Sequence, residues 1–199
     1  MPKRKRGQAS TQRAPSADTK RPGAWRLFSI GHSNHSVEEL LGLLRRYGIE
    51  TVVDVRSAPG SRYVPHFDAG PLRAALAAAG IAYKYLGKEL GGRPQRREYY
   101  DERGRVLYER LAHSPPFRRG MHRLAWLAAR SCVALLCSEE DPTSCHRRLL
   151  IGPVAAATGL VLGHIRASGA MQTEAHLGHA AGSGAPEDAC EQYIQLRLL

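Results

Sequence analysis

The sequence predicts an α/β protein built on a single open, mostly parallel sheet with helices on both faces, in a Rossmann-like arrangement. Three observations support this fold class: short apolar runs rich in β-branched residues recur along the chain, helical patterns follow most of them, and polar residues gather where the runs end. Strands that alternate with helices form parallel sheets, because each helix returns the chain across one face of the sheet.

The first strand-like run ends at Gly31, and a helix signal follows over residues 36–48. Ser36 is the expected N-cap of this helix, Glu39 completes a capping box, and Gly48 ends the helix. The next segments predict a strand over 49–59, a loop over 60–70, a helix over 71–80 and a short strand that breaks into a Gly-rich loop over 81–92.

The second half continues the alternation after an insertion. Residues 93–120 are dense in charge and aromatic residues without a clear period, which indicates a loop or short helical insertion that could cover a site. The patterns that follow predict a helix over 121–131, a buried strand over 132–140, a helix over 143–159 and a last strand over 160–165.

The formal charge of +11 is uneven along the 199 residues. Residues 1–26 hold eight basic residues and one acidic residue, and they lack an apolar run that could offset their ordering entropy. We therefore expect a disordered basic tail over 1–26, available to contact nucleic acid, an α/β domain over 27–166, and a flexible tail over 167–199 with a short terminal element.

The four cysteines do not form the distributed pattern of a secreted disulfide framework. Cys132, Cys137 and Cys145 lie in or beside one segment, and Cys190 is far from them. The chain also has neither a secretory signal nor a run of 18 apolar residues. We expect a soluble, cytoplasmic protein with reduced thiols and no membrane partner.

Polar residues follow each predicted strand, and in an open parallel sheet these positions meet at one edge, where ligands bind. Helix capping explains some of them, but not arginines near helix starts, which oppose the helix dipole unless an anion lies between. The expected acid-base residues are Asp54, Glu139, His32 and His146. The expected anion-binding residues are Ser33, Arg56, Arg62, Gly91, Gly92 and Arg147.

The segment ALLCSEEDPTSCHRRLLIG, residues 134–152, allows three interpretations. Structural zinc sites use paired cysteines two to four residues apart, so the wider spacing of Cys137 and Cys145 argues against a metal, and we predict no cofactor. A reactive thiol at Cys145 is favoured by His146 and Arg147, but the three neighbouring carboxylates oppose it. We favour an anion site, at which backbone N–H groups, imidazole and guanidinium converge on a phosphate.

Four motifs in order, GHS at 31–33, VDVR at 53–56, LGG at 90–92 and C-x-E followed by CHR at 137–147, resemble the bacterial and archaeal family called domain of unknown function 488. The similarity runs from about Ile30 to Ile165, outside both tails. It implies the fold and the site but no settled activity. The site residues that it implies are Gly31, His32, Ser33, Asp54, Val55, Arg56, Arg62, Leu90, Gly91, Gly92, Cys137, Glu139, Cys145, His146 and Arg147.

The leading functional hypothesis is an enzyme, in the hydrolase class, that cleaves a nucleotide or nucleic acid hydrolytically or at a glycosidic bond. Glu139 would act on water opposite Asp54 while the arginines hold phosphate. One alternative is a module that binds a phosphate-bearing small molecule or nucleic acid without chemistry. A second is thiol or metal activity through Cys137 and Cys145. It also stays open that Asp54 and Glu139 only form structural ion pairs with Arg56 and Arg147.

Overall fold

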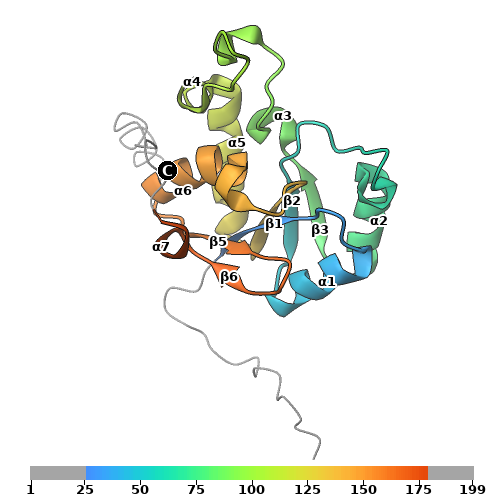
Figure 1. Ribbon diagram of the computed structural model, residues 1–199. Coiled ribbons are helices and arrows are strands. Elements are labelled where there is room, and N and C mark those ends of the chain that lie inside the picture. Colours follow the sequence, from blue (N-terminus) through green and yellow to red (C-terminus); the bar gives the residue numbers. More distant parts are fainter. Residues whose placement is uncertain (1–25, 179–199) are drawn as a thin grey trace, which may run out of the picture.

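The computed structural model describes residues 26–178, which form a six-stranded sheet in the order β3-β2-β4-β1-β5-β6 (Figure 1). The predicted basic tail and the chain after residue 178 lie outside the described residues. The first five strands are parallel, and β6 pairs antiparallel with β5. The strands are β1 Leu27–Gly31, β2 Thr51–Asp54, β3 Ala82–Tyr85, β4 Val133–Cys137, β5 Leu162–Ile165 and β6 Met171–Gln172.

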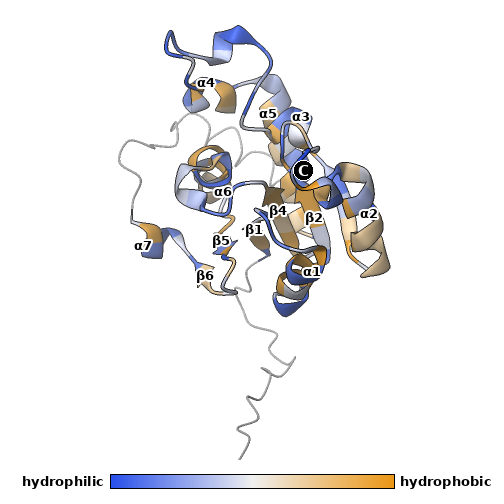
Figure 2. Cartoon of the chain, turned by 45° about the vertical axis from the view of Figure 1, so that its right-hand side comes forward, coloured by the Kyte–Doolittle hydropathy of each residue, from blue (hydrophilic) through white to orange (hydrophobic). Residues whose placement is uncertain are grey.

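Helices cover both faces of the sheet, so the predicted α/β fold with a single open, mostly parallel sheet is confirmed. They are α1 Val37–Arg46, α2 Ala69–Ala78, α3 Gly87–Leu90, α4 Tyr108–Ala112, α5 Pro115–Ala128, α6 Gly152–Ala157 and α7 Glu174–Leu177. Alternate residues of β4 point to opposite faces, with Leu135 in the core under α5 and α6 and Leu136 in the core under α1 and α2. The buried central strands are accordingly hydrophobic (Figure 2).

Several boundaries differ from the sequence prediction. Helix α5 begins at Pro115 rather than near 121, because the Ser114 side chain accepts a hydrogen bond from Phe117 N and Pro115 takes the first helical position. The helix predicted over 143–159 is divided into a 3-10 turn at Pro142–Ser144, a π-helical turn at Arg147–Ile151 and α6. Strand β6 and α7 lie within the range predicted as a tail.

Strand β4 lies in the middle of the sheet, between β1 and β2. This order differs from the 3-2-1-4-5-6 order of dinucleotide-binding sheets, and it brings the loops that follow β1, β2 and β4 together at the carboxyl edge. Gly31 allows the loop after β4 to pass very close to the end of β1, since a Cβ at this position would lie 1.8 Å from the carbonyl oxygen of Glu139. The loop after β4 therefore folds directly over the end of β1.

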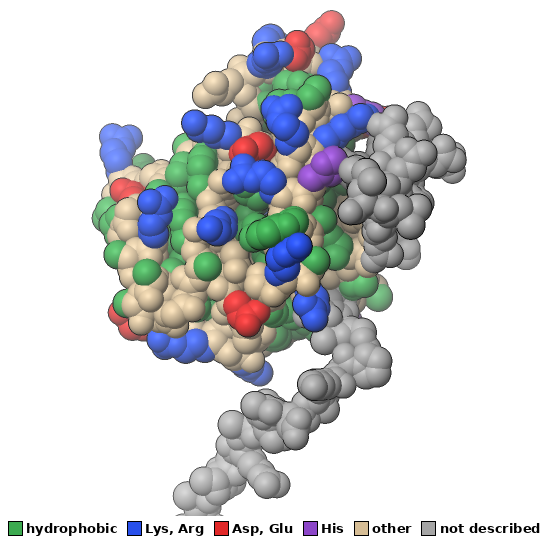
Figure 3. Space-filling view, turned by 180° about the vertical axis from the view of Figure 1, so that it is seen from behind, with side chains coloured by type: hydrophobic (Ala, Val, Ile, Leu, Met, Phe, Trp, Pro, Cys, Tyr) green, Lys and Arg blue, Asp and Glu red, His purple; other side chains and the backbone are tan. Residues whose placement is uncertain are grey.

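Within the described residues, no helix is long and apolar enough to cross a bilayer. The face shown in Figure 3 carries Lys and Arg side chains spread among fewer acidic ones, rather than gathered into one stripe. A basic surface raises the local concentration of anions.

Candidate functional site

A cavity of about 370 Å³ opens at the carboxyl edge of the sheet, beside the ends of β2 and β4. Its size is within the usual range for small-molecule sites, which starts at about 300 Å³. The loop after β2, the segment after α3, the start of α4 and the segment after β4 all contribute to its wall. The lining residues are Arg56, Ser57, Ala58, Gly92, Arg93, Tyr108, Cys137, Ser138, Glu139, Ser144, Cys145 and His146.

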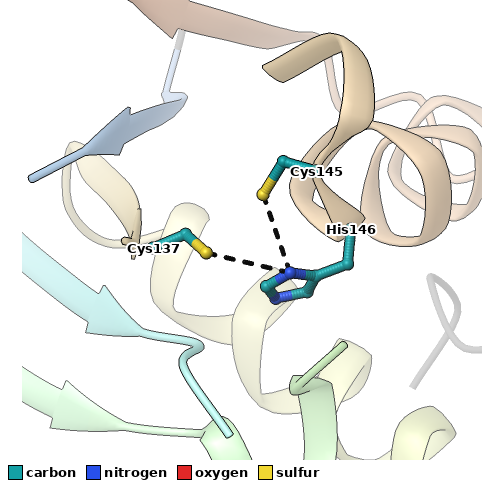
Figure 4. A group of neighbouring side chains, drawn as sticks. All are labelled: Cys137, Cys145 and His146. Atoms are coloured by element: carbon teal, nitrogen blue, oxygen red, sulfur yellow. Dashed lines mark hydrogen bonds between the residues drawn. The ribbon is translucent and has the colours of Figure 1, made fainter. Parts of the chain in front are cut away.

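Two thiols and an imidazole converge in the wall of this cavity (Figure 4). The Nδ1 atom of His146 lies 3.7 Å from Cys145 Sγ and 3.9 Å from Cys137 Sγ, and the three atoms are all within 4.8 Å of one another. All three residues are buried. We refer to Cys137, Cys145 and His146 as the Cys–Cys–His cluster.

The tautomer of His146 follows from its second contact. Its Nε2 atom lies 3.1 Å from the carbonyl oxygen of Val55. A carbonyl can only accept a hydrogen bond, so Nε2 carries the proton and, in the neutral ring, Nδ1 presents a lone pair to the two sulfur atoms. The backbone after β2 thus orients a ring that belongs to the segment after β4.

The loop between the two cysteines is shaped by its own hydrogen bonds. Cys137 ends β4, and the Asp141 side chain then accepts a 2.9 Å hydrogen bond from Thr143 N at the start of the 3-10 turn. The same backbone hydrogen bond lowers the pKa of Asp141, so its carboxylate stays ionised as an N-cap. The turn brings Cys145 back over the end of the strand that it left at Cys137.

The two thiols differ in their electrostatic environments. A hydrogen bond from the Cys137 thiol is the main cause that lowers the pKa of Cys145, and the guanidinium of Arg147 acts in the same direction. The reciprocal hydrogen bond and burial raise the pKa of Cys137. Cys145 is therefore the thiolate of the pair and Cys137 keeps the shared proton.

The two glycines predicted to bind an anion permit close backbone approach. A Cβ on Gly92 would lie 2.6 Å from the imidazole Cγ of His146, and one on Gly91 would lie 2.3 Å from the carbonyl oxygen of Gly87. Only Gly92 lines the cavity. The LGG segment is thus the support on which the His146 ring rests.

A second polar cluster, Asp54, Arg56 and His32, follows β1 and β2. Asp54 is fully buried and accepts from Arg56 Nε at 2.9 Å, Arg56 Nη2 at 2.6 Å and Tyr83 Oη at 2.8 Å. Arg56 Nη1 donates to His32 Nε2 at 3.1 Å, and His32 Nδ1 donates to the Ser33 carbonyl at 2.9 Å. Among these three residues, only Arg56 lines the cavity.

His32 is neutral in this arrangement. Burial is the main cause that lowers its pKa to about 4, and the ring stacks on Phe67 with 4.5 Å between centroids. A neutral imidazole that accepts from Arg56 and donates to a carbonyl has no free ring nitrogen for a substrate. His32 therefore positions Arg56.

The structure places Arg147, Ser33 and Arg62 outside the cavity wall. Arg147 is buried and donates to Cys145 Sγ at 3.1 Å and to the carbonyl oxygens of Glu139 and Glu140. Ser33 forms the turn after β1 with a φ of 45°, and Arg62 is exposed. Arg147 thus holds the loop after β4 rather than a ligand in the cavity.

Two charged side chains of the cavity wall, which we call uncommitted, have no partner among the described residues. The carboxylate of Glu139 and the guanidinium of Arg93 make no hydrogen bond or ion pair within residues 26–178. Tyr108 joins them from α4, and burial raises its pKa. Arg93 and Tyr108 were not among the predicted site residues, although Arg93 directly follows the LGG motif and Tyr108 lies in the aromatic-rich insertion.

Comparison with protein families shows that residues 36–152 match a family described as Domain of unknown function DUF488. The matched segment covers more than half of the chain and reaches from the N-cap of α1 through the Cys–Cys–His cluster to the first residue of α6. No curated protein and no solved structure matches the chain.

Proposed function

The chain belongs to the DUF488 family, and from the geometry of its cavity we propose that it is an enzyme that hydrolyses a phosphate-bearing substrate of mononucleotide size. The observation that carries this proposal is the pair of uncommitted charges, Glu139 and Arg93, in one cavity wall. Charged groups that structural ion pairs do not consume are available to a ligand, which is typical of a functional site.

The two charges suit different steps of one hydrolysis. Arg93 offers a guanidinium fork, which binds a phosphate through two parallel hydrogen bonds. Glu139 offers a carboxylate that can take a proton from water as the water attacks the scissile ester or glycosidic bond, and the leaving group then takes a proton. Tyr108 presents an aromatic ring beside them, on which a base can stack.

The cavity favours a small nucleotide over a long nucleic acid. Its volume of about 370 Å³ fits a ligand of that size. The basic side chains on the face seen in Figure 3 are dispersed and do not form the continuous stripe that tracks a strand or a duplex. Their net effect is to attract anions to the surface.

Incubation of the full chain with a panel of nucleoside mono-, di- and triphosphates and dinucleotides, with products identified by mass spectrometry, tests the proposal. We expect turnover of at least one class. Glu139→Gln should lower kcat by about 100-fold or more with little change in KM, because it removes the proton acceptor but keeps the shape. Arg93→Ala should instead raise KM.

The chain offers matched controls for both variants. Glu102 and Arg103 are exposed neighbours in the insertion, and neither lines the cavity. Glu102→Gln and Arg103→Ala should leave kcat and KM unchanged. Binding of nucleotides that Arg93→Ala weakens, without turnover of any of them, would make the cavity a binding module and overturn the enzymatic proposal.

A further inference from the structure

We propose that the Cys–Cys–His cluster is a transition-metal site, best suited to zinc, with Cys137, Cys145 and His146 as three ligands and a fourth position open to the cavity. Metal binding by these residues is independent of the proposed hydrolysis, whereas the catalytic use of the metal rests on it.

The separations of the donor atoms fit a tetrahedral ion. Zinc binds sulfur at about 2.3 Å and imidazole nitrogen at about 2.0 Å, which places a ligand sulfur about 3.5 Å from a ligand nitrogen in tetrahedral geometry. The observed distances from His146 Nδ1 to the two Sγ atoms, 3.7 Å and 3.9 Å, exceed that value by a few tenths of an ångström. All three donor atoms lie within 4.8 Å of one another, and side-chain rotations that shorten these separations would bring them onto one ion.

The surroundings hold the donors in their ligating form. His146 donates its Nε2 proton to the Val55 carbonyl, which is the usual outer contact of a metal-bound histidine and directs Nδ1 to the ion. Each sulfur also has an N–H donor, from Arg147 Nε to Cys145 and from the backbone of Glu139 to Cys137. Such donors satisfy the remaining lone pairs of metal-bound thiolates.

Without a bound ion, the Cys–Cys–His cluster buries donor atoms that interact only weakly with one another. In the part of the chain that the structure describes, the Nδ1 lone pair of His146 faces only the two sulfur atoms, at 3.7 Å and 3.9 Å, and a thiol is a weak donor. The neighbouring Asp54, Arg56 and His32 show how this protein satisfies buried polar groups, with strong hydrogen bonds on every side. A soft cation supplies the missing partner of the cluster, because thiolates and imidazole are the ligands that zinc prefers.

The fourth side of the site faces the substrate cavity. Three protein ligands with one open position are typical of catalytic zinc, as in sites with two cysteines and one histidine. A water on that position becomes a nucleophile near neutral pH. Glu139, two residues after the first ligand, would accept its proton, the hydroxide oxygen would bond to the electrophilic atom, and the proton would pass to the leaving group as its bond breaks.

The first test is the metal content of the full chain, purified without chelators and measured by inductively coupled plasma mass spectrometry. We expect one zinc or similar ion per chain. Replacement by Co²⁺ should give the visible bands of tetrahedral cobalt and a thiolate-to-metal charge-transfer band. X-ray absorption of the zinc form should show two sulfur ligands and one histidine, which tests the site without any substitution.

Single variants then assign the ligands. Cys137→Ser, Cys145→Ser and His146→Ala should each weaken zinc binding by more than about 100-fold, which exceeds the effect typical of outer contacts. Cys132→Ser is the matched control, because this half-buried thiol contacts the Tyr47 carbonyl and lies outside the cluster. Circular dichroism of the metal-free variants separates lost ligation from lost folding.

The outcomes separate this inference from the proposed function. Metal bound by the three residues without turnover of any nucleotide supports the site and overturns only the hydrolase. Turnover that persists in metal-free protein supports the hydrolase and overturns the catalytic use of the metal. Absence of bound metal and of the cobalt bands, or a Cys137–Cys145 disulfide in the purified protein, overturns the site itself.

Discussion

Two polar clusters lie side by side at the carboxyl edge of this sheet, and they differ in how fully their members are satisfied. In the cluster of Asp54, Arg56 and His32, strong donors face strong acceptors, and the carboxylate alone accepts from two groups of Arg56 and from Tyr83. In the cluster of Cys137, Cys145 and His146, weak donors and lone pairs face one another beside a cavity. Polar residues at a strand end therefore do not by themselves indicate function, since those of the first cluster bond to one another and stabilise the fold.

Removing one member of the satisfied cluster should have the largest effect on stability. Asp54→Ala leaves the buried Arg56 guanidinium without its carboxylate, and breaking a buried ion pair in this way costs about 3–5 kcal/mol. In the metal-free protein, Cys145→Ala should cost less, about 1–3 kcal/mol, because Arg147 loses one partner but keeps the carbonyl oxygens of Glu139 and Glu140. Urea denaturation of both variants measures the contrast, and equal losses would contradict it.

The free energy of unfolding should decrease between pH 7 and pH 4, in part because of His32. Its pKa falls from 6.5 to about 4 on folding, so between these values the unfolded chain binds more protons and stability decreases as the pH falls. The loss attributable to His32 should reach about 3 kcal/mol at pH 4 and be absent above pH 7. Burial also lowers the pKa of His164, so this residue likewise makes the protein less stable as the pH falls.

His32→Gln should flatten this dependence, because glutamine does not titrate. Denaturation midpoints between pH 7 and pH 4 would show a smaller decrease in the variant than in the wild-type protein. A variant that loses stability over this interval as steeply as the wild type would show that His32 is not the titrating group.

Gly92→Ala tests the connection between the LGG segment and the imidazole. The added methyl group would lie within 3 Å of three side-chain atoms of His146, two of them in the ring, so the ring must move or the loop must shift, at a cost of about 1–3 kcal/mol. Zinc affinity should decrease as well, because ligand orientation depends on that ring. Gly42→Ala, in α1 with open space around it, should instead stabilise the protein by about 0.5–1 kcal/mol.

The fold class could be predicted because strand and helix patterns alternate along the chain, and the sequence also predicts the capping box of Ser36 and Glu39. The start of α5 could not be predicted, because the charged face of Pro115–Ala128 obscures its helical period and the Ser114 cap lies inside a Pro-rich segment. Likewise, β6 consists of two residues, which is too short for a pattern.

The candidate site could be predicted only in part from the sequence. The sequence shows which polar residues follow each strand, but not which of them pair with one another, so it does not distinguish an arginine in an ion pair from an unpaired one. The spacing of Cys137 and Cys145 is wide for a local metal loop, yet the Asp141 cap turns the chain so that both sulfurs face one imidazole. Three-dimensional pairing therefore separates Arg56, which is bound to Asp54, from Arg93, whose side chain has no partner within residues 26–178.

The smallest expected effect separates two exposed arginines. The sequence places Arg62 among the anion-binding residues, whereas the structure puts it outside the cavity wall, to which Arg93 belongs. Arg62→Ala should change stability by less than about 0.5 kcal/mol, as is usual for surface substitutions. It should also leave nucleotide binding unchanged, while Arg93→Ala weakens it several-fold. Titration calorimetry with the same nucleotide compares them, and weakening by both variants would extend the anion site beyond the cavity to the loop after β2.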